Sequence, residues 1–459
     1  MSTMSAFASL VNKFNQRFKK EFSLSTGLYH YLREREDEKM RLHLRIDADG
    51  SGLLIANANR VVHLNPSAVS MAYLYLEGHT PESAARVLRQ QFDISTADVV
   101  QDFLAFTSQL EDLISPNGGC PVCELSLETM APFSATPSAP YRMDLALTYR
   151  CNNDCHHCYN ARSRNYPEIG VESWMQIIDK IWDLSIPHIV FTGGEPTLYQ
   201  GLPELVAYAE SKGLITGLNT NGRKLADQAY LDKLVTAGLD HVQITFESHD
   251  AAIHNQMVAA KNAWAETVAG LKNVLLTPLY VMTNTTLLTH NAPTIEATLE
   301  FLAQLGVPTI GLNALIYSGK GETVDTGLKE TELPSLLEKA REITQSNEQR
   351  LIWYTPTQYC HFNPIQLDLG IKGCTAALYN MCVESNGDVI PCQSYYQSLG
   401  NLLEDSWHEI WEHPLALQLR NRQDIPEGCR ACDYLPECGG GCPLARQHQT
   451  IHPIKNPVF

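Results

Sequence analysis

The sequence predicts a three-part α/β protein, in which a partial (β/α)6 barrel follows a winged-helix-like α+β domain and precedes a cysteine-rich C-terminal domain. Three observations support this prediction. Apolar strand-like runs alternate with helical stretches through the middle of the chain, shorter alternating runs and helical segments precede them, and most cysteines follow residue 350. We therefore divide the chain into an arm, an α+β domain, a linker, a barrel and a cysteine-rich domain, at residues 1–38, 39–115, 116–141, 142–350 and 351–459.

Composition limits the classes of protein to consider. A formal charge of -17 argues against broad attraction to nucleic acid phosphates or to an anionic membrane surface. The first residues lack a secretion-signal pattern, and no stretch approaches the roughly 18 apolar residues of a membrane span. We expect a cytoplasmic protein without nucleic acid or membrane partners. In that reducing compartment, 13 cysteines indicate metal or redox chemistry rather than disulfides.

The N-terminal part predicts a small antiparallel meander followed by three helices. The arm ends in an amphipathic segment, YHYLREREDE, which fits a docked helix or a loose arm. Strands are expected over residues 41–46, 51–56 and 60–65, and helices after Pro66, from Thr80 and from Ser95. The linker is rich in Pro, Gly and Ser and contains Cys120 and Cys123. We interpret these two as reduced thiols, with half a metal site or a redox pair as alternatives.

The central part predicts parallel strands joined by helical crossovers. The six expected strands are at 144–150, 187–192, 214–220, 241–247, 279–287 and 308–315. Six units favour an incomplete barrel over a closed eight-unit one, and active groups belong at the carboxyl ends of such strands.

Three cysteines follow the first of these strands in the sequence CNNDCHHCY. Cys151, Cys155 and Cys158 place three thiolates on one loop at the catalytic end of the sheet. Three cysteines on a cubane cluster leave one iron open for a small ligand, whereas a structural zinc needs four ligands. Zinc with His156 or His157 as fourth ligand is the alternative, which the strand context disfavours.

The CxxxCxxC spacing resembles the cluster motif of the radical SAM superfamily. The resemblance implies a 4Fe-4S cluster on the three cysteines and bound S-adenosylmethionine (AdoMet). It also implies reductive cleavage of AdoMet to a 5'-deoxyadenosyl radical that abstracts hydrogen from an unactivated position. His157 occupies the family's aromatic position against the adenine, with Tyr159 as a second candidate. We assign no catalytic residue beyond the cluster.

A glycine-rich motif ends the second strand, and the resemblance makes it the site of the methionine amino group. Its glycines allow close approach of the backbone, and its glutamate supplies a carboxylate for an ammonium group. The motif residues are Gly193, Gly194, Glu195 and Pro196.

Polar residues at the ends of the third and fourth strands are further candidates for cofactor contacts. Asn221 is one, and Thr245 and Glu247 are candidates for the ribose or carboxylate. Polar residues at strand ends are also common as caps.

The C-terminal cysteines resemble the SPASM extension of radical SAM enzymes, which houses auxiliary iron-sulfur clusters. The resemblance assigns the first cluster to Cys374, Cys382, Cys392 and Cys442, and the second to Cys429, Cys432 and Cys438. The downstream cysteine of that pattern does not occur in the sequence, so His448, His452, Asp433, Cys360 or a substrate group completes the second cluster, or only one auxiliary cluster forms. A structural zinc on four of these cysteines is the alternative, which the upstream motif disfavours.

Residues 39–115 resemble the peptide-binding protein of pyrroloquinoline quinone biosynthesis and related recognition elements of peptide-modifying enzymes. The resemblance implies that a leader peptide adds as a strand near Arg60 to Leu64. A purely structural or dimerising domain is the alternative. DNA binding is disfavoured because the second helix carries only Arg86 and Arg89 as basic residues.

These features lead to the hypothesis of a radical SAM maturase that modifies a side chain of a ribosomally synthesised peptide. Its expected partners are a precursor or leader peptide and a low-potential electron donor such as flavodoxin or ferredoxin. One alternative keeps the radical enzyme and takes a small-molecule or porphyrin-type cofactor precursor as substrate. Another is a non-enzymatic iron-sulfur carrier or regulator.

Overall fold

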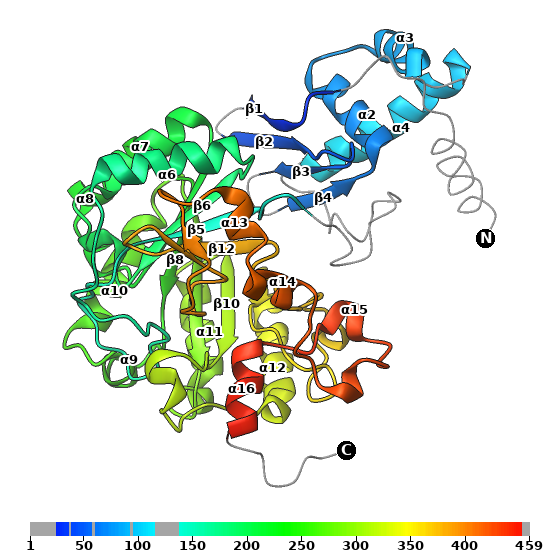
Figure 1. Ribbon diagram of the computed structural model, residues 1–459. Coiled ribbons are helices and arrows are strands. Elements are labelled where there is room, and N and C mark those ends of the chain that lie inside the picture. The colour runs from blue at the N-terminus through cyan, green and yellow to red at the C-terminus, as the bar shows by residue number, and fades with distance from the viewer. Residues whose placement is uncertain (1–23, 36–37, 57–59, 92–94, 115–136, 452–459) are drawn as a thin grey trace. The chain divides into compact units, whose positions relative to one another are not determined.

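The computed structural model describes most of the chain as two compact units (Figure 1). One unit comprises residues 1–138 with 182–187, and the other comprises 139–181 with 188–459. The residues described are 24–35, 38–56, 60–91, 95–114 and 137–451. The cysteines of the predicted linker, Cys120 and Cys123, lie outside them, as does His452.

The smaller unit contains a four-stranded antiparallel sheet and three helices. The strands follow chain order across the sheet: β1 (Gly27–Arg35), β2 (Glu38–Ile46), β3 (Gly52–Ala56) and β4 (Arg60–Leu64). The helices are α2 (Pro66–Leu76), α3 (Pro81–Gln91) and α4 (Thr96–Ile114). The predictions of β2 to β4 and of all three helices are confirmed.

The expectation of a helix or loose arm is wrong for residues 27–35, which form strand β1. β1 pairs with β2 along its whole length, from Gly27 opposite Ile46 to Arg35 opposite Glu38. Tyr29 and Tyr31 alternate along this strand and pack on the core. The period of two was obscured by the charged run that follows it in the sequence.

The core of the smaller unit lies where the sheet meets the helices. Leu42, Leu44 and Leu54 from the strands and Leu74 from α2 are almost completely buried, and each such leucine contributes about 1.5–3 kcal/mol. Asn65 begins α2, because its side chain accepts a hydrogen bond from the Ala68 N–H at 2.9 Å and Pro66 takes the first helical position.

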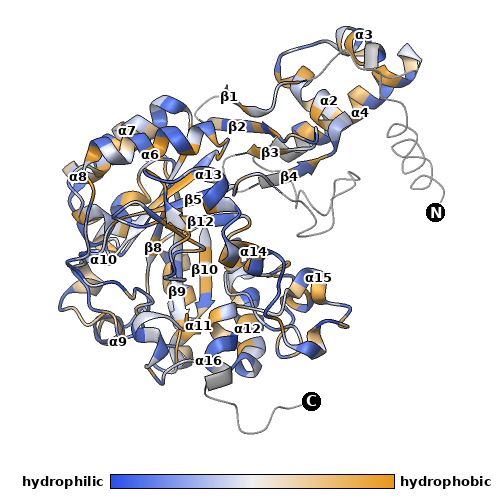
Figure 2. Ribbon diagram, viewed as in Figure 1, coloured by the Kyte–Doolittle hydropathy of each residue, from blue (hydrophilic) through white to orange (hydrophobic). Residues whose placement is uncertain are grey.

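The larger unit is built on one ten-stranded sheet in the order β11-β10-β9-β8-β7-β6-β5-β12-β13-β14. Figure 2 shows hydrophobic residues along its strands, β10 among them. The central strands are β5 (Arg142–Thr148), β6 (His188–Gly193), β7 (Ile215–Thr220), β8 (His241–Thr245), β9 (Tyr280–Leu287) and β10 (Thr309–Ala314). They pair in parallel, which confirms the six predicted strands.

Two further parallel strands extend the sheet beyond the predicted six. β11 (Arg350–Trp353) pairs with β10, and β12 (Asn380–Val383) pairs with β5. The short strands β13 (Asp388–Ile390) and β14 (Gly400–Asn401) continue from β12 in antiparallel fashion. The cysteine-rich region therefore contributes strands to the barrel's own sheet.

Helices connect the parallel strands and also occur within the cysteine-rich region. The crossover helices are α6 (Val171–Asp183), α7 (Leu202–Lys212), α8 (Gln228–Thr236), α9 (Ala251–Met257), α10 (Ala263–Val274), α11 (Ile295–Gln304) and α12 (Leu333–Ser346). The later helices are α13 (Trp407–Trp411), α14 (Pro414–Arg420), α15 (Leu435–Cys438) and α16 (Pro443–Ile451). Within the described part of the chain, no helix is both long and apolar enough to cross a membrane.

Candidate metal and cofactor site

The first cysteine loop leaves the carboxyl end of β5 and is fixed to the end of α9. The backbone N–H of Asp154 donates to the Val258 carbonyl at 2.9 Å, and that of His156 donates to the Met257 carbonyl at 3.1 Å. A turn within the loop brings the Cys158 N–H to the Cys155 carbonyl at 3.3 Å. The loop is therefore shaped by the protein itself.

The three thiols of this loop lie close together and are partly buried. The pKa of the Cys151 thiol is raised to about 11, mainly by burial and in smaller part by the neighbouring Glu195 and Cys158. Burial also raises the pKa of Cys155, and Cys158, Glu247 and Cys151 raise it further. The pKa of Cys158 is likewise raised by burial. Three adjacent thiols fit the three-cysteine set of a cluster with one open iron. Because the thiol form is favoured, cluster binding has to displace their protons.

Two cations, which the motif analysis did not identify, hold the cysteine loop. Arg164 donates to the carbonyl oxygens of Cys151 and Asn153 at 2.7 and 2.5 Å. Lys320 forms an ion pair with Asp154 at 2.6 Å, and its backbone N–H donates to the Cys158 carbonyl at 2.9 Å. The arginines in ARSR, just after the motif, were the available signal for the first contact. Both cations also favour the charged form of the Cys158 thiol.

The two glycines of the second motif allow the end of β6 to lie directly against the start of the cysteine loop. Gly193 has φ +137°, and a Cβ there would lie 2.1 Å from the Thr148 carbonyl oxygen. A Cβ on Gly194 would lie 2.5 Å from the Arg150 carbonyl oxygen. The Gly194 N–H donates to Thr148 O at 2.7 Å. This approach requires glycine at both positions.

Glu195 is fully buried, and hydrogen bonds hold its carboxylate in place. Oε1 accepts from the Thr197 N–H and hydroxyl and from the Thr220 hydroxyl, and Oε2 accepts from the Asn221 N–H at 2.8 Å. Burial raises its pKa, and these donors oppose that effect. Since a carboxylate offers about four acceptor positions, two on each oxygen, Oε2 retains one for an ammonium donor. Pro196 begins a short 3-10 turn after it.

The strand-end candidates lie at the expected edge of the sheet. Asn221 donates through Nδ2 to Asn152 Oδ1 at 2.6 Å, which links the end of β7 to the cysteine loop. Thr245 is half-buried at the end of β8, opposite Asn284 of β9. The structure thus brings Asn221 to the cysteine loop and the GGEP motif.

His157 points into the protein rather than standing free in the loop. Its Nε2 lies 3.0 Å from Oε1 of Glu247, and Oε2 of Glu247 accepts from the Thr286 N–H at 3.0 Å. This buried pair anchors the loop to the residues after β8. Within the described part of the chain, His157 Nδ1 and Asn313 Oδ1 are buried without a hydrogen-bond partner. A stacking role for His157 against adenine stays a prediction.

Tyr159 points toward the second cysteine set. Its hydroxyl donates to Gln393 Oε1 at 3.2 Å, directly beside Cys392. Burial, followed by the charges of Cys158 and Asp144, raises its pKa. The residue therefore connects the two cysteine regions of the larger unit.

Three of the four thiols assigned to the first auxiliary cluster are neighbours in the folded chain. The pKa of Cys374 is raised to about 12 by burial with a contribution from Cys442. Cys374 and Cys442 also both raise the pKa of Cys392. Cys382 lies in β12 and packs with Ala146 and Ile390, and Cys392 is also among the groups that raise its pKa. Its place in the apolar cluster distinguishes it from the other three.

The remaining assigned thiols form a second group. The Cys432 N–H donates to the Cys429 carbonyl at 3.2 Å, and Cys438 and Cys432 both raise the pKa of Cys429 after the effect of burial. Across the described residues, no three Cys, His, Asp or Glu side chains are gathered tightly enough to hold a single metal ion. A cubane spreads its thiolates over separate irons, which places them further apart than ligands of one ion.

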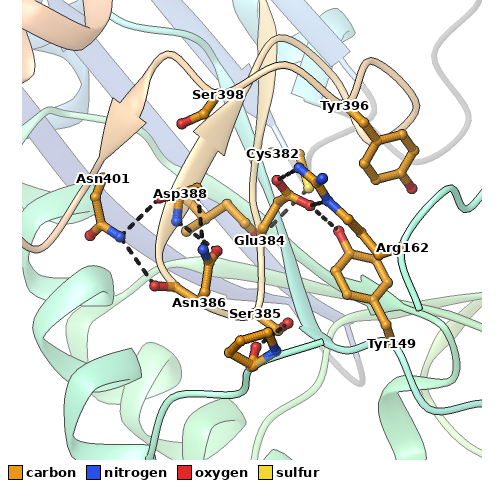
Figure 3. A network of polar contacts seen from close by, with 12 residues as sticks. Tyr149, Arg162, Cys382, Glu384, Ser385, Asn386, Asp388, Tyr396, Ser398 and Asn401 are labelled. Carbon is orange, nitrogen blue, oxygen red and sulfur yellow. Dashed lines mark hydrogen bonds and ion pairs between the residues drawn. The ribbon is translucent and has the colours of Figure 1, made fainter. Parts of the chain in front are cut away.

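A buried carboxylate that was not predicted joins the cysteine loop to β12 (Figure 3). Glu384 accepts two hydrogen bonds from the Arg162 guanidinium, at 2.6 and 2.5 Å, and one from the Tyr149 hydroxyl at 3.0 Å. The bond to Glu384 raises the pKa of Arg162 above its ordinary value. The Arg162 guanidinium also lies over the rings of Tyr166 and Tyr396. This network fixes the segment after Cys158 against the strand that contains Cys382.

Fold and site together define a partial-barrel enzyme with a three-cysteine cluster loop and a second cysteine-rich region. Residues 145–302 match the model of the Radical SAM superfamily, and residues 374–433 match that of the SPASM iron-sulfur cluster-binding domain. The chain therefore contains a radical SAM domain followed by a SPASM domain. Its cofactors are AdoMet and 4Fe-4S clusters, with which the thiol sets are compatible.

Solved structures share this fold at low sequence identity. SuiB of Streptococcus suis, solved with its precursor peptide SuiA, is 16% identical with a TM-score of 0.65, over 88% of this chain and 94% of that chain. SuiB has also been solved with S-adenosylmethionine, with the same identity and TM-score. Native anSMEcpe with bound AdoMet is 18% identical with a TM-score of 0.54, over 67% of this chain and 91% of that chain.

Proposed function

We propose that this enzyme modifies a side chain of a ribosomally synthesised peptide, which it recognises through its N-terminal unit. The observation that supports the proposal is strand β4 at the edge of the N-terminal sheet. Among the described residues β4 pairs with β3 alone, which makes it an edge strand of the sheet, the position at which an extended chain can add as a further strand. Such an edge suits an extended peptide, whose main chain supplies the hydrogen bonds.

The similarity to SuiB and anSMEcpe adds support of a second kind. SuiB has been solved with a precursor peptide, and anSMEcpe with AdoMet and a peptide. The SuiB alignment includes 88% of this chain, which extends beyond the two matched family domains. We transfer the class of substrate, a peptide, and propose a low-potential flavodoxin or ferredoxin as electron donor.

The proposed site residues have separate roles. Cys151, Cys155 and Cys158 hold the cluster, while Arg164 and Lys320 keep their loop in shape. Glu195 Oε2 accepts a hydrogen bond from the AdoMet ammonium, and Gly193 and Gly194 keep the backbone close to it. Asn221, Thr245, His157 and Tyr159 complete the proposed cofactor surroundings. When bound, the reduced cluster and AdoMet supply the carbon radical that abstracts hydrogen from the substrate.

The second cysteine region has a proposed role in holding auxiliary clusters. Its first cluster would take Cys374, Cys382, Cys392 and Cys442, and its second would take Cys429, Cys432 and Cys438. The alternative substrate class, a small-molecule or porphyrin-type precursor, has no need of a strand edge. Peptide binding at β4 therefore separates the two hypotheses.

Hydrogen exchange tests the recognition step directly. A peptide encoded by a short reading frame beside the gene, added at about 100 times its Kd, is expected to slow exchange of the outward amides of residues 60–64 by roughly 10- to 100-fold. Strand β1, the opposite edge of the same sheet, is the internal control and should exchange as before. Deleting residues 1–115 should weaken peptide affinity at least about tenfold while AdoMet cleavage persists. Unchanged exchange at β4 with bound peptide would contradict this recognition mode.

A further inference from the structure

The second auxiliary set has three assigned cysteines, and a cubane held wholly by protein takes four thiolates. Those three are Cys429, Cys432 and Cys438. A fourth protein ligand has to come from a segment that packs against this set.

Residues 356–359 contact this second auxiliary set. The Tyr359 N–H donates to Cys438 Sγ at 3.4 Å, and Cys438 Sγ lies 3.6 Å from the Thr357 carbonyl oxygen. The Cys442 N–H donates to the Pro356 carbonyl at 3.1 Å. These contacts hold residues 356–359 against residues 438–442. The next residue in the chain is Cys360.

The Cys360 side chain is exposed and lies beside the set formed by Cys429, Cys432 and Cys438. It lines a cavity of about 280 Å³ together with Tyr359 and with Tyr434, which stands between Cys432 and Cys438 in the sequence. The rings of Tyr359 and Tyr434 are 6.3 Å apart. Burial raises the pKa of Cys360, and the nearby thiols of Cys438 and Cys429 raise it further. Two of the three assigned ligands are thus its electrostatic neighbours.

The position of Cys360 is fixed on its other side. Nδ1 of His361 lies 2.8 Å from Oε2 of Glu330, and the Phe362 carbonyl accepts from the buried Thr357 hydroxyl at 3.1 Å. These contacts hold the segment around Cys360 as a turn. Such support is what keeps a metal ligand in place.

The other described candidates are placed less well. The His448 ring stacks on Tyr317 with centroids 4.2 Å apart. Asp433 is exposed, and its carboxylate is a harder ligand than the thiolates that iron-sulfur clusters prefer. A fourth thiolate matches the chemistry of the other three.

We propose that Cys360 is the fourth protein ligand of the second auxiliary cluster. The proposal rests on the assignment of Cys429, Cys432 and Cys438 as ligands of that cluster, and it is independent of the peptide substrate. Ligation converts the thiol to a thiolate with release of one proton and formation of one iron-sulfur bond, without change of oxidation state. The cluster is then closed to substrate, so it serves electron transfer or stability rather than substrate binding.

Iron analysis of the reconstituted full chain tests this ligand. Cys360→Ala and Cys432→Ala are each expected to lose about one to four irons per chain and to show an altered electron paramagnetic resonance spectrum. Both side chains are exposed, so neither substitution removes core packing. Asp433→Ala and His448→Ala are the matched controls and should keep the wild-type iron and sulfide content.

Three results would overturn the proposal. Cys360→Ala could retain the wild-type iron, sulfide and spectrum, or Asp433→Ala or His448→Ala could lose the iron instead. Wild-type iron content in Cys432→Ala would show that no second cluster is present to be ligated. Iron content does not depend on substrate, so each of these results leaves the proposed function standing.

Discussion

Replacing Cys151, Cys155 and Cys158 together by Ala is expected to abolish AdoMet cleavage. The three thiols lie on one loop that backbone hydrogen bonds hold in shape, and they are the only cysteines of the described residues that precede α6. Without them no thiolate remains at the carboxyl end of β5 to hold a cluster. The measurement is 5'-deoxyadenosine formed after anaerobic reduction, together with iron per chain. We expect no detectable product and a loss of about four irons.

The comparison for this variant is the replacement of Cys429, Cys432 and Cys438 together by Ala. It removes the same number of thiols from the second group, so it should lose iron while the loop after β5 still supports cleavage. If the variant without Cys151, Cys155 and Cys158 cleaved AdoMet at a rate close to that of the wild type, the assignment of the cluster loop would be refuted.

Glu384→Ala is expected to destabilise the larger unit by about 3–5 kcal/mol, because it leaves the Arg162 guanidinium without its carboxylate. Glu384 is fully buried, Arg162 is about one quarter exposed, and the Tyr149 hydroxyl loses its acceptor as well. The lower end of that range is expected, since water reaches part of Arg162. The midpoint of thermal unfolding of the reconstituted protein should fall by on the order of 5 to 10 °C.

An exposed ion pair provides the control for Glu384. Glu296 pairs with Lys339 at 2.7 Å, and both side chains are more than half exposed. Glu296→Ala should therefore leave the midpoint of thermal unfolding close to that of the wild type. Equal shifts for Glu296→Ala and Glu384→Ala would contradict the structural role of the buried network.

The sequence was sufficient where local pattern determines structure. Apolar strand runs alternating with helical segments predicted β5 to β10, and Pro66 and Thr80 marked the starts of two helices of the smaller unit. β1 was missed because its alternation, which places Tyr29 and Tyr31 on one face, runs into a charged segment. β11 and β12 were missed because four-residue strands carry little periodicity.

Motif spacing located the cluster loop but not the contacts that shape it. His157 and Glu247 are 90 positions apart, and Arg162 and Glu384 are 222 apart. Only the folded chain brings such side chains together, so residue spacing could not indicate that His157 is paired inside the protein. Cys360 illustrates the same limit, because its neighbours Cys429 and Cys438 are supplied by a distant segment.

Transfer of deuterium from peptide to AdoMet-derived product tests the central claim most directly. The reduced enzyme would be incubated with AdoMet and a fully deuterated peptide from a neighbouring short reading frame, and both products analysed by mass spectrometry. A radical SAM peptide-modifying enzyme should yield deuterium-containing 5'-deoxyadenosine and a peptide whose mass changes only when AdoMet is present. Unlabelled 5'-deoxyadenosine with a peptide of unchanged mass would contradict the account.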